Sequence, residues 1–419
     1  MVFLVLLVGV FALILSGCGT EETTTTSAAV DTTATTEAST SSTAGGTETT
    51  AGEATGEPVK MGFDEGFTGF MAYDVALCEK GILTALSMVD NQVVGRPIEY
   101  IKADNGSDPV VAVDKARQLV ESDKINVLLG PIFSPAVQAV TDYLGKSSGI
   151  PQISILGQPR DNLATANKLA FMPMGLAGGQ GYYFGKYCAE QLGYKTVNAI
   201  HYEDTQSHQL QEGFEKGFTE GGGTITSLNF VPIDTVDFSS YLTTLKPADA
   251  TLFWIFGNGA VPFVKQYNDY GLTMPLLVPM ANNFSDEQLA ELGEMGVGMV
   301  ACDIYAYKVD YPMNQEFIAA FQKLYPDENP TPQAFGGWQA VMMAVEAIKL
   351  TNGDLTPAKL IEAMSTMTLE TPGGSMTMQP YKDGFVATRD FFILETKDVG
   401  EGKITWVPLY TYKQVFLGE

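Results

Sequence analysis

Both histidines of the chain, His201 and His208, lie close in sequence to Glu203 and Asp204. Imidazole and carboxylate groups are common zinc ligands, so four such side chains within eight residues would permit a metal site. The spacing matches no recognised ligand pattern, and His201 follows an apolar run whereas His208 begins a predicted helix. We therefore interpret them as polar residues on a loop, and we predict no metal and no other cofactor.

Two glycine-containing patterns invite an enzymatic interpretation. Residues 145–149, GKSSG, match the G-x-S-x-G pattern of a serine nucleophile, which needs a strand before it and a helix after it. Here the predicted order is reversed. Residues 296–301, GVGMVA, resemble a dinucleotide-binding fingerprint but lead into a strand, whereas a bound phosphate needs a helix N-terminus. Neither pattern has its required context, so no enzyme activity is predicted.

The elements that would position any site alternate between strands and helices. An amphipathic helix follows Asp108 and Pro109, which supply a cap and a first-turn residue. Apolar runs without alternation are typical of parallel strands covered on both faces. The runs are NVLLGP, IPQISI, TVNAIHY, ATLFWIFG, PLLVPM and GMVACDIYAY. The pattern predicts an α/β fold with doubly wound parallel sheets, whose ligands lie beyond the carboxyl ends of the strands.

Several longer stretches resemble one known family. They are VKMGFDEGFTGFMAYD, GIPQISI, VDFSSYLTTLK, VKQYNDYGL and, most specifically, residues 95–131. The chain from residue 59 to about residue 381 is similar to the leucine/isoleucine/valine-binding-protein family, the substrate-binding proteins of ABC importers. The resemblance implies a type I periplasmic binding protein: two doubly wound lobes joined by a three-segment hinge. Lobe one would comprise residues 59–173 and 304–386, and lobe two residues 174–303 and 387–419.

The resemblance also implies ligand-binding positions in lobe one. Ser134 follows the strand NVLLGP and matches a serine that the family uses for ligand, although it would equally serve as a helix cap. Phe133 before it is either a pocket wall or core. Tyr73 matches an aromatic residue placed over the ligand, or it is a packing residue. Gly157 and Gln158 stand where amino-acid-binding members carry Ala or Ser and Thr, whose amides and hydroxyl complete a carboxylate clamp. No Ser or Thr stands here, so the clamp is altered.

Lobe two and other segments of lobe one supply the remaining candidates. Gln206 stands where the family often has a tyrosine, and Asn258 lies in another contact loop. The loop that carries an acid in branched-chain amino-acid receptors contains Asn282 and no acid. Tyr305 follows residues 302–304, the second of the three segments that would join the lobes. Arg160 would be either a cation for an anionic ligand or an exposed loop residue. Asp64 and Glu65 would be either replacement acids or a solvated loop.

The N-terminus predicts an exported lipoprotein. Residues 1–17 form an apolar segment too short to span a bilayer, and the following Cys18 completes a box, LSGC, that resembles a bacterial lipidation site. Residues 18–57, rich in Thr, Ser, Ala and Gly, predict a disordered tether. Three further cysteines, Cys78, Cys188 and Cys302, allow no complete disulfide set, and we expect buried free thiols.

The net charge of −25 makes the protein a poor candidate for binding nucleic acid or anionic membrane surfaces, because both are polyanions, and we predict no nucleic-acid partner. We therefore predict a monomeric, lipid-anchored protein on the outer face of the cytoplasmic membrane that binds a small molecule and delivers it to ABC permease and ATPase subunits. The ligand would be a small polar metabolite: amino-acid-like, an amide or an organic acid. A sensing protein that feeds a signalling partner is the alternative.

Overall fold

A computed structural model describes residues 56–233 and 235–419. The predicted signal peptide, the lipidation site at Cys18 and the predicted tether up to residue 55 lie outside the described residues. No helix within the described part of the chain is both long enough and apolar enough to cross a membrane.

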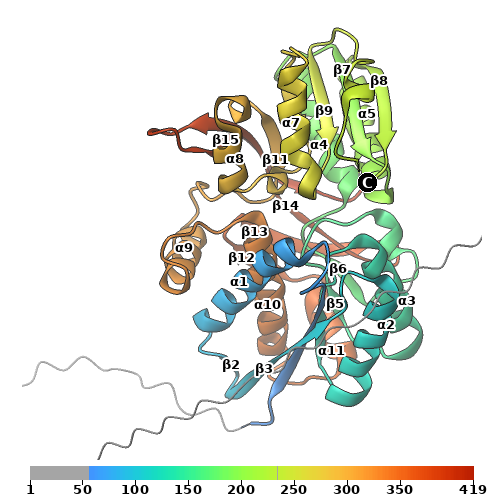
Figure 1. Ribbon diagram of the computed structural model, residues 1–419. Helices are drawn as coiled ribbons and strands as arrows, with labels where there is room; N and C mark the ends of the chain where they lie inside the picture. The colour runs from blue at the N-terminus through green and yellow to red at the C-terminus, as the bar shows by residue number, and fades with distance from the viewer. Residues whose placement is uncertain (1–55, 234) are drawn as a thin grey trace, which may run out of the picture. The chain divides into compact units, whose positions relative to one another are not determined.

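The first lobe is built on strands in the order β2-β3-β1-β4-β5-β6, followed by the start of β14. Apart from the antiparallel β2–β3 pair, these strands run parallel. The strands are β1 (Val59–Glu65), β2 (Gln92–Val93), β3 (Arg96–Asp104), β4 (Val127–Leu129), β5 (Gln152–Ile153) and β6 (Ala170–Met172). Figure 1 shows helices α1, α2, α3 and α10 beside these strands.

The second lobe continues from β14 through β11-β10-β9-β7-β8, again with parallel strands from β11 onward. Its strands are β7 (Thr196–Tyr202), β8 (Thr224–Val231), β9 (Ala250–Trp254), β10 (Leu276–Val278) and β11 (Val300–Asp303). The predicted α/β class and the predicted parallel strands are confirmed. The lobe boundaries predicted from the sequence stay a prediction.

The helices of the first lobe are α1 (Ala72–Met88), α2 (Pro109–Gln118), α3 (Ser134–Ser147), α9 (Pro312–Leu324), α10 (Pro332–Leu350) and α11 (Pro357–Ser365). The second lobe carries α4 (Ala177–Glu190), α5 (Thr205–Glu220), α6 (Ser239–Leu242), α7 (Ala260–Asp269) and α8 (Asp286–Leu292). Asp108 caps α2 as predicted, because its carboxylate accepts from the backbone N–H groups of Val110 and Val111.

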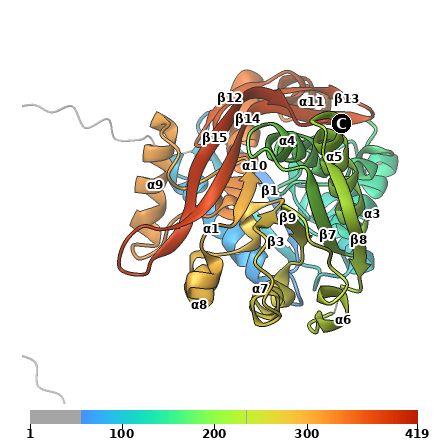
Figure 2. The same ribbon diagram turned by 90° about the horizontal axis from the view of Figure 1, so that it is seen from above.

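One long strand, β14 (Gly384–Asp398), belongs to both lobes. Its first residues pair in parallel with β6, and residues from Phe392 onward pair antiparallel with β11. It also pairs with β13 (Gly374–Tyr381) and β15 (Ile404–Phe416), while β12 (Thr368–Thr371) pairs with β13. Figure 2 shows β14 and β15 as adjacent long strands. The sequence analysis did not anticipate this antiparallel group.

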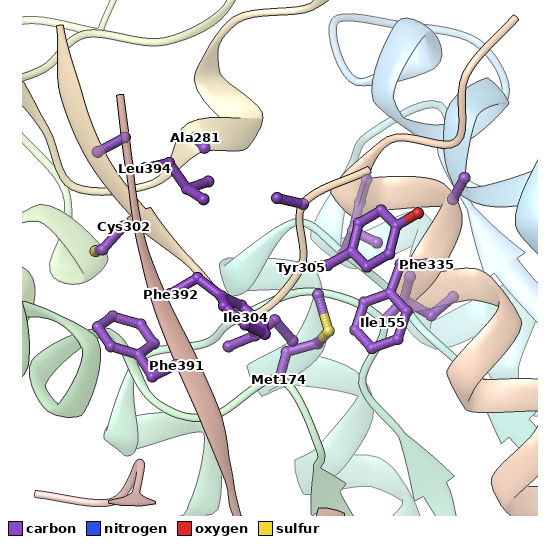
Figure 3. Close-up of a cluster of buried hydrophobic side chains, with 14 of the residues drawn as sticks. Ile155, Met174, Ala281, Cys302, Ile304, Tyr305, Phe335, Phe391, Phe392 and Leu394 are labelled. Carbon is purple, nitrogen blue, oxygen red and sulfur yellow. The ribbon is translucent and has the colours of Figure 1, made fainter. Parts of the chain in front are cut away.

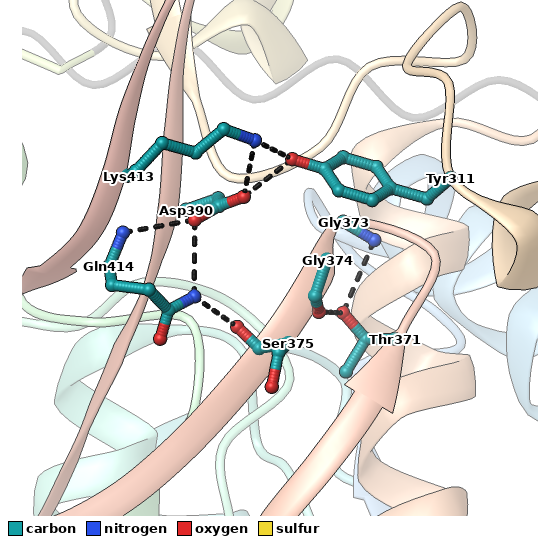
Figure 4. Close-up of polar contacts among 8 residues, drawn as sticks. All are labelled: Tyr311, Thr371, Gly373, Gly374, Ser375, Asp390, Lys413 and Gln414. Carbon is teal, nitrogen blue, oxygen red and sulfur yellow. Dashed lines mark hydrogen bonds and ion pairs between the residues drawn. The ribbon is translucent and has the colours of Figure 1, made fainter.

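Polar contacts hold β14 to its neighbours. Asp390 accepts from the side chains of Tyr311, Lys413 and Gln414 and from the Gln414 backbone N–H, as Figure 4 shows. Burial acts to raise the pKa of Asp390, but these hydrogen bonds outweigh it and leave the pKa below its usual value. Gln414 also donates to the Ser375 carbonyl, so one side chain joins β13, β14 and β15.

The hydrophobic core continues through the region where the lobes meet. Figure 3 shows Met174, Cys302, Ile304, Phe391 and Phe392 together with neighbours from both lobes. These side chains are at most 3% exposed. Cys78, Cys188 and Cys302 are free and buried, which confirms the prediction for the three thiols.

Helices α4 and α5 approach each other backbone to backbone at four glycines. A Cβ atom on Gly213 would lie 2.0 Å from the Gly178 carbonyl oxygen, and one on Gly217 would lie 2.0 Å from that of Tyr182. Gly181 and Gly185 on α4 meet α5 in the same way. Only glycine permits this spacing, because the contacted atoms are backbone atoms that cannot rotate away.

We expect Gly213→Ala to destabilise the protein by about 1–3 kcal/mol, because the overlap outweighs the better helix propensity of alanine. Denaturant unfolding monitored by circular dichroism would measure the change. Glu215→Ala, on the exposed face of the same helix, is the control and should alter stability little. Equal stability of the Gly213 variant and the wild type would contradict the close approach.

Candidate functional site

A cavity of about 1060 Å³ lies between the two lobes. The first lobe lines it with the start of α1, the loop from Ile132 to Pro135 that leads into α3, and the residues around Gln333 at the start of α10. The second lobe contributes the start of α5, the end of β9, the segment that follows β10, and the first residues of α8. These are mainly segments that follow strands, the positions where doubly wound sheets place their ligands.

Seven of the nine predicted ligand-binding residues line this cavity, and the other two do not. Tyr73, Phe133, Ser134, Gly157, Gln206, Asn282 and Tyr305 are lining residues. Gln158 and Asn258 are not among the described residues that line it. Whether any of the nine contacts a ligand stays a prediction.

The Ser134 hydroxyl is engaged across the cavity. Ser134 opens α3, and its Oγ donates to Oε1 of Gln206 over 3.2 Å. The amide nitrogen of Gln206 in turn lies 3.5 Å from the carbonyl oxygen of Gly157. Three residues predicted separately from the two lobes therefore meet through one side chain, that of Gln206.

Gln158 and Asn258 occupy different surroundings. The Gln158 side chain is fully buried; it donates to the Ile132 carbonyl over 3.0 Å and accepts from Asn162 over 2.9 Å. Gln158 thus fixes the backbone of the loop that carries Phe133 and Ser134. Asn258 lies exposed in a 3₁₀ turn, Gly257–Gly259, while its neighbour Gly257 lines the cavity.

A polar chain connects the lobes on another side of the cavity. The Gln333 amide donates to Asp74 over 3.1 Å and to the Asn282 carbonyl over 3.2 Å. The Asn282 backbone N–H donates to Asp303 over 3.2 Å. Burial raises the pKa of Asp74, and the hydrogen bond from Gln333 opposes that increase. Asp74 and Gln333 were missed in the sequence, although Asp74 directly follows Tyr73.

Tyr305 forms part of the wall with its ring rather than its hydroxyl. The ring stacks on Phe335 at a centroid distance of 4.9 Å, and the hydroxyl donates to Asn314 over 3.0 Å. Further aromatic residues that the sequence analysis did not single out also line the cavity: Phe70, Trp254, Phe256, Phe284, Tyr307 and Trp406. Aromatic residues scattered along a chain carry no signal that would group them in advance.

The solvated-loop interpretation of Asp64 and Glu65 is wrong. Both residues end strand β1 and are at most 1% exposed. Burial raises the pKa of Asp64 to about 8, and the Asn105 amide, which donates to it over 3.0 Å, opposes the shift. Burial also raises the pKa of Glu65 well above its usual value. Neither side chain is among the described residues that line the cavity.

The loop placement of the histidines is also wrong. His201 lies inside strand β7, fully buried, with Nε2 2.9 Å from Oε1 of Gln211. His208 lies in the first turns of α5, where it pairs with Glu203 at 2.7 Å and stacks on Phe230. Among the described residues, no group of three His, Cys, Asp or Glu side chains is placed to hold a metal ion.

The chain belongs to the periplasmic binding protein family, because the family model described by that name matches residues 58–402. The chain is 24% identical over 362 residues to Leu/Ile/Val-binding protein homolog 6 of Brucella melitensis biotype 1, covering 84% of this chain and 91% of that one. It is also 24% identical to the leucine-, isoleucine-, valine-, threonine-, and alanine-binding protein of Pseudomonas aeruginosa, covering 81% and 90%. The resemblance predicted from the sequence is confirmed.

Solved structures agree on the fold. A solute-binding protein of an ABC transporter from Rhodopseudomonas palustris BisB5, in complex with 3,4-dihydroxybenzoic acid, superposes with a TM-score of 0.77 at 24% identity, covering 85% of this chain and 98% of that one. Leucine-binding protein LivK of Thermotoga maritima gives a TM-score of 0.75 at 19% identity, covering 85% and 99%. The fold is that of type I periplasmic binding proteins, which are non-enzymatic and extracytoplasmic components of transport systems.

Asp64→Asn should flatten the dependence of stability on pH. The folded carboxyl keeps its proton up to a pKa of about 8, whereas the unfolded one loses it near 3.8, so the folded state binds more protons between these values. Stability is therefore greatest below the lower value and falls as the pH rises toward 8. Asparagine mimics the protonated acid and should reduce the loss between pH 5 and pH 8 by about 2 kcal/mol or more.

Urea unfolding at pH 5 and pH 8 would measure this difference. Asp114→Asn, which removes an exposed carboxylate on α2, is the control and should keep the wild-type slope. An unchanged slope in the Asp64 variant would show that this carboxyl titrates normally.

Proposed function

We propose that this chain is the solute receptor of an ABC importer. It captures a small polar metabolite, which is amino-acid-like, an amide or an organic acid, in the cavity between the lobes and delivers the closed complex to permease and ATPase subunits. The observation that carries the proposal is the 1060 Å³ cavity, to which both lobes contribute seven of the predicted ligand-binding residues. The names of the relatives and of the solved neighbours support it as well.

Closure of the lobes around the solute is the expected signal to the permease. Side chains that already join the lobes across the cavity, such as Gln206 with Ser134 and Gln333 with Asn282, are suited to respond to a bound molecule. A ligand that replaced or extended these hydrogen bonds would favour the closed arrangement, because it would contact both lobes at once.

The site is not arranged for branched-chain amino acids, so we expect leucine, isoleucine and valine to bind more weakly than micromolar. A zwitterion needs a partner for each charge, and an unpaired buried charge costs several kcal/mol. The carboxylate is the charge left without a partner, because the loop after β5 carries Gly157 and Gln158 where amino-acid-binding members carry Ala or Ser and Thr. The loop after β10 carries Asn282 in place of the family's acid, so an ammonium group would depend on other lining carboxylates such as Asp74.

Thermal-shift screening of ligand-stripped protein against amino acids, amides, urea derivatives, aromatic acids and polyols would identify the solute. A ligand at about a hundred times its Kd adds ~2.7 kcal/mol, which displaces Tm by several degrees. Loss of uptake of that solute on deletion of the gene would support import. Submicromolar binding of a branched-chain amino acid would contradict the expected weak binding of these amino acids, and unchanged uptake would contradict the import function.

We propose that a lipid on Cys18 anchors the protein to the membrane. We expect Cys18→Ala to move the protein from the membrane fraction to the soluble extracytoplasmic fraction, because the variant lacks the thiol that would carry the lipid. Immunoblotting of fractionated cells measures this, with Cys78→Ala, a buried thiol, as the control that stays in the membrane fraction. Retention of the Cys18 variant in that fraction would exclude lipidation as the anchor.

A further inference from the structure

The cavity is lined by many more acids than bases. Its lining includes seven carboxylates, Asp74, Asp161, Asp204, Asp286, Glu287, Asp327 and Glu328. Lys403 is the one basic side chain among the described residues that line it, and it lies exposed in the turn between β14 and β15. The whole chain has only about twice as many acids as bases, 49 against 24, so the lining is more acidic than the chain as a whole.

Arg160, considered above as a cation for an anionic ligand, forms ion pairs with other side chains of the protein instead. Arg160 forms ion pairs with Glu212 at 3.0 Å, with Asp161 at 3.8 Å and with Glu419. It lines a smaller depression beside α4 and α5 and is not among the described residues of the main cavity. An anion in the main cavity would therefore lack a buried basic partner, and repulsion from the carboxylates would add to its desolvation cost.

Two buried side-chain oxygens of residues that line the cavity have no hydrogen-bond partner among the described residues. The Asn283 side chain is 7% exposed, and its amide nitrogen must donate to the Ile255 carbonyl over 2.9 Å. That bond fixes Oδ1 as the other end, and among the described residues Oδ1 has no partner. Oδ1 of the adjacent Asn282 is likewise buried without a partner in the described part of the chain. The Gln333 amide donates to the Asn282 backbone carbonyl and to the carboxylate of Asp74, and Asn283 directly follows Asn282, so the three residues are neighbours.

Aromatic faces surround the same space. Phe70 and Phe133 meet edge to face at 5.0 Å, and Trp254 and Phe256 lie 5.5 Å apart at a tilt. Tyr73 is 52% exposed although it lines the cavity. The negative face of an aromatic ring attracts cations, and several rings around one site are a recognised way to bind an organic cation.

We infer that the cavity takes an organic cation: an ammonium or amidinium group, donating hydrogen bonds to the Asp74, Asn282 and Asn283 oxygens, on an aromatic or similarly apolar body. This inference rests on the proposed function and narrows its ligand class to the amine and amide side, away from organic acids. The acceptor oxygens and the acidic lining would stabilise the positive charge of the ligand. The aromatic side chains would pack against its apolar body.

Three near-isosteric probes test the charge directly: benzamidine, benzamide and benzoate, which share a ring and a planar head but carry charges of +1, 0 and −1. Ligand-observed NMR or calorimetry at pH 7 with the full-length folded protein should give the affinity order benzamidine, benzamide, benzoate. We expect at least about a tenfold difference between the two ends of the series. Asp74→Asn should weaken benzamidine severalfold and change benzamide little, while the exposed control Asp114→Asn should change neither.

Benzoate binding as tightly as benzamidine would overturn the inference, and so would the absence of binding by all three probes at up to about 10 mM. An unchanged benzamidine affinity in Asp74→Asn would remove Asp74 from the site and overturn the inference in this form. In each of these cases, a solute found by the thermal-shift screen and lost from uptake on gene deletion would leave the proposed receptor function standing.

Discussion

The chain passes between the lobes at three places, the first near Pro173, the second near Asp303 and the third in β14, and these passages converge on one buried guanidinium, that of Arg389. The residue is fully buried in β14, the strand shared by both sheets. It donates to the Pro173 carbonyl on the first passage over 3.0 Å and to Gln339 over 2.7 Å. Its charge also acts on Asp303, at the second passage. Burial lowers the pKa of Arg389 to about 9, and the charge of Asp303 opposes that decrease.

The buried charge of Arg389 restricts how the three segments that join the lobes can move relative to one another. Burial raises the pKa of Asp303 to about 7, while backbone N–H groups of Ile304, Asn282 and Tyr305 and the charge of Arg389 stabilise its ionised form. Separating the guanidinium from its carbonyl and amide partners would leave charge unpaired in a dry environment, which is costly. The passages are therefore expected to move together, with the change in lobe orientation absorbed by backbone rotation around them.

The sequence predicted the fold because the signals were local and repeated. Long apolar runs marked the parallel strands, and Asp108 with Pro109 marked the start of α2. The strands β13, β14 and β15 were not predicted, because their pairing depends on partners far along the chain and because their residues mix polar and apolar types. Asp64 and Glu65 were misjudged because charge alone suggests solvent, whereas β1 runs on into a region covered by Asn105 and the loop before α3.

The site was predictable to the level of loops and less so to the level of atoms. Parallel strands end at a common edge, so Ser134 and Gly157, which follow β4 and β5 of the first lobe, could be placed near one another from their positions after strands. The structural role of Gln158 could not be predicted from the sequence, because it depends on a hydrogen bond to the carbonyl of Ile132. Gln333 could not be predicted either. It reaches the cavity from a helix that lies over 250 residues after Asp74 in the sequence.

One residue links the passages between the lobes to the cavity. The backbone N–H of Asn282 donates to Asp303, its carbonyl accepts from Gln333, and its side-chain oxygen is buried beside the cavity. Phe335 provides a second link, since one face of its ring lies 5.1 Å from the Arg389 guanidinium and the ring stacks with Tyr305 of the cavity wall. A molecule that hydrogen-bonds Asn282 or packs on Tyr305 therefore acts on groups held directly by Asp303 and Arg389. Because both charged groups are buried, a small displacement of either partner changes their interaction more than it would in water. Asn282 and Phe335 thus connect the cavity wall directly to the buried pair of Asp303 and Arg389.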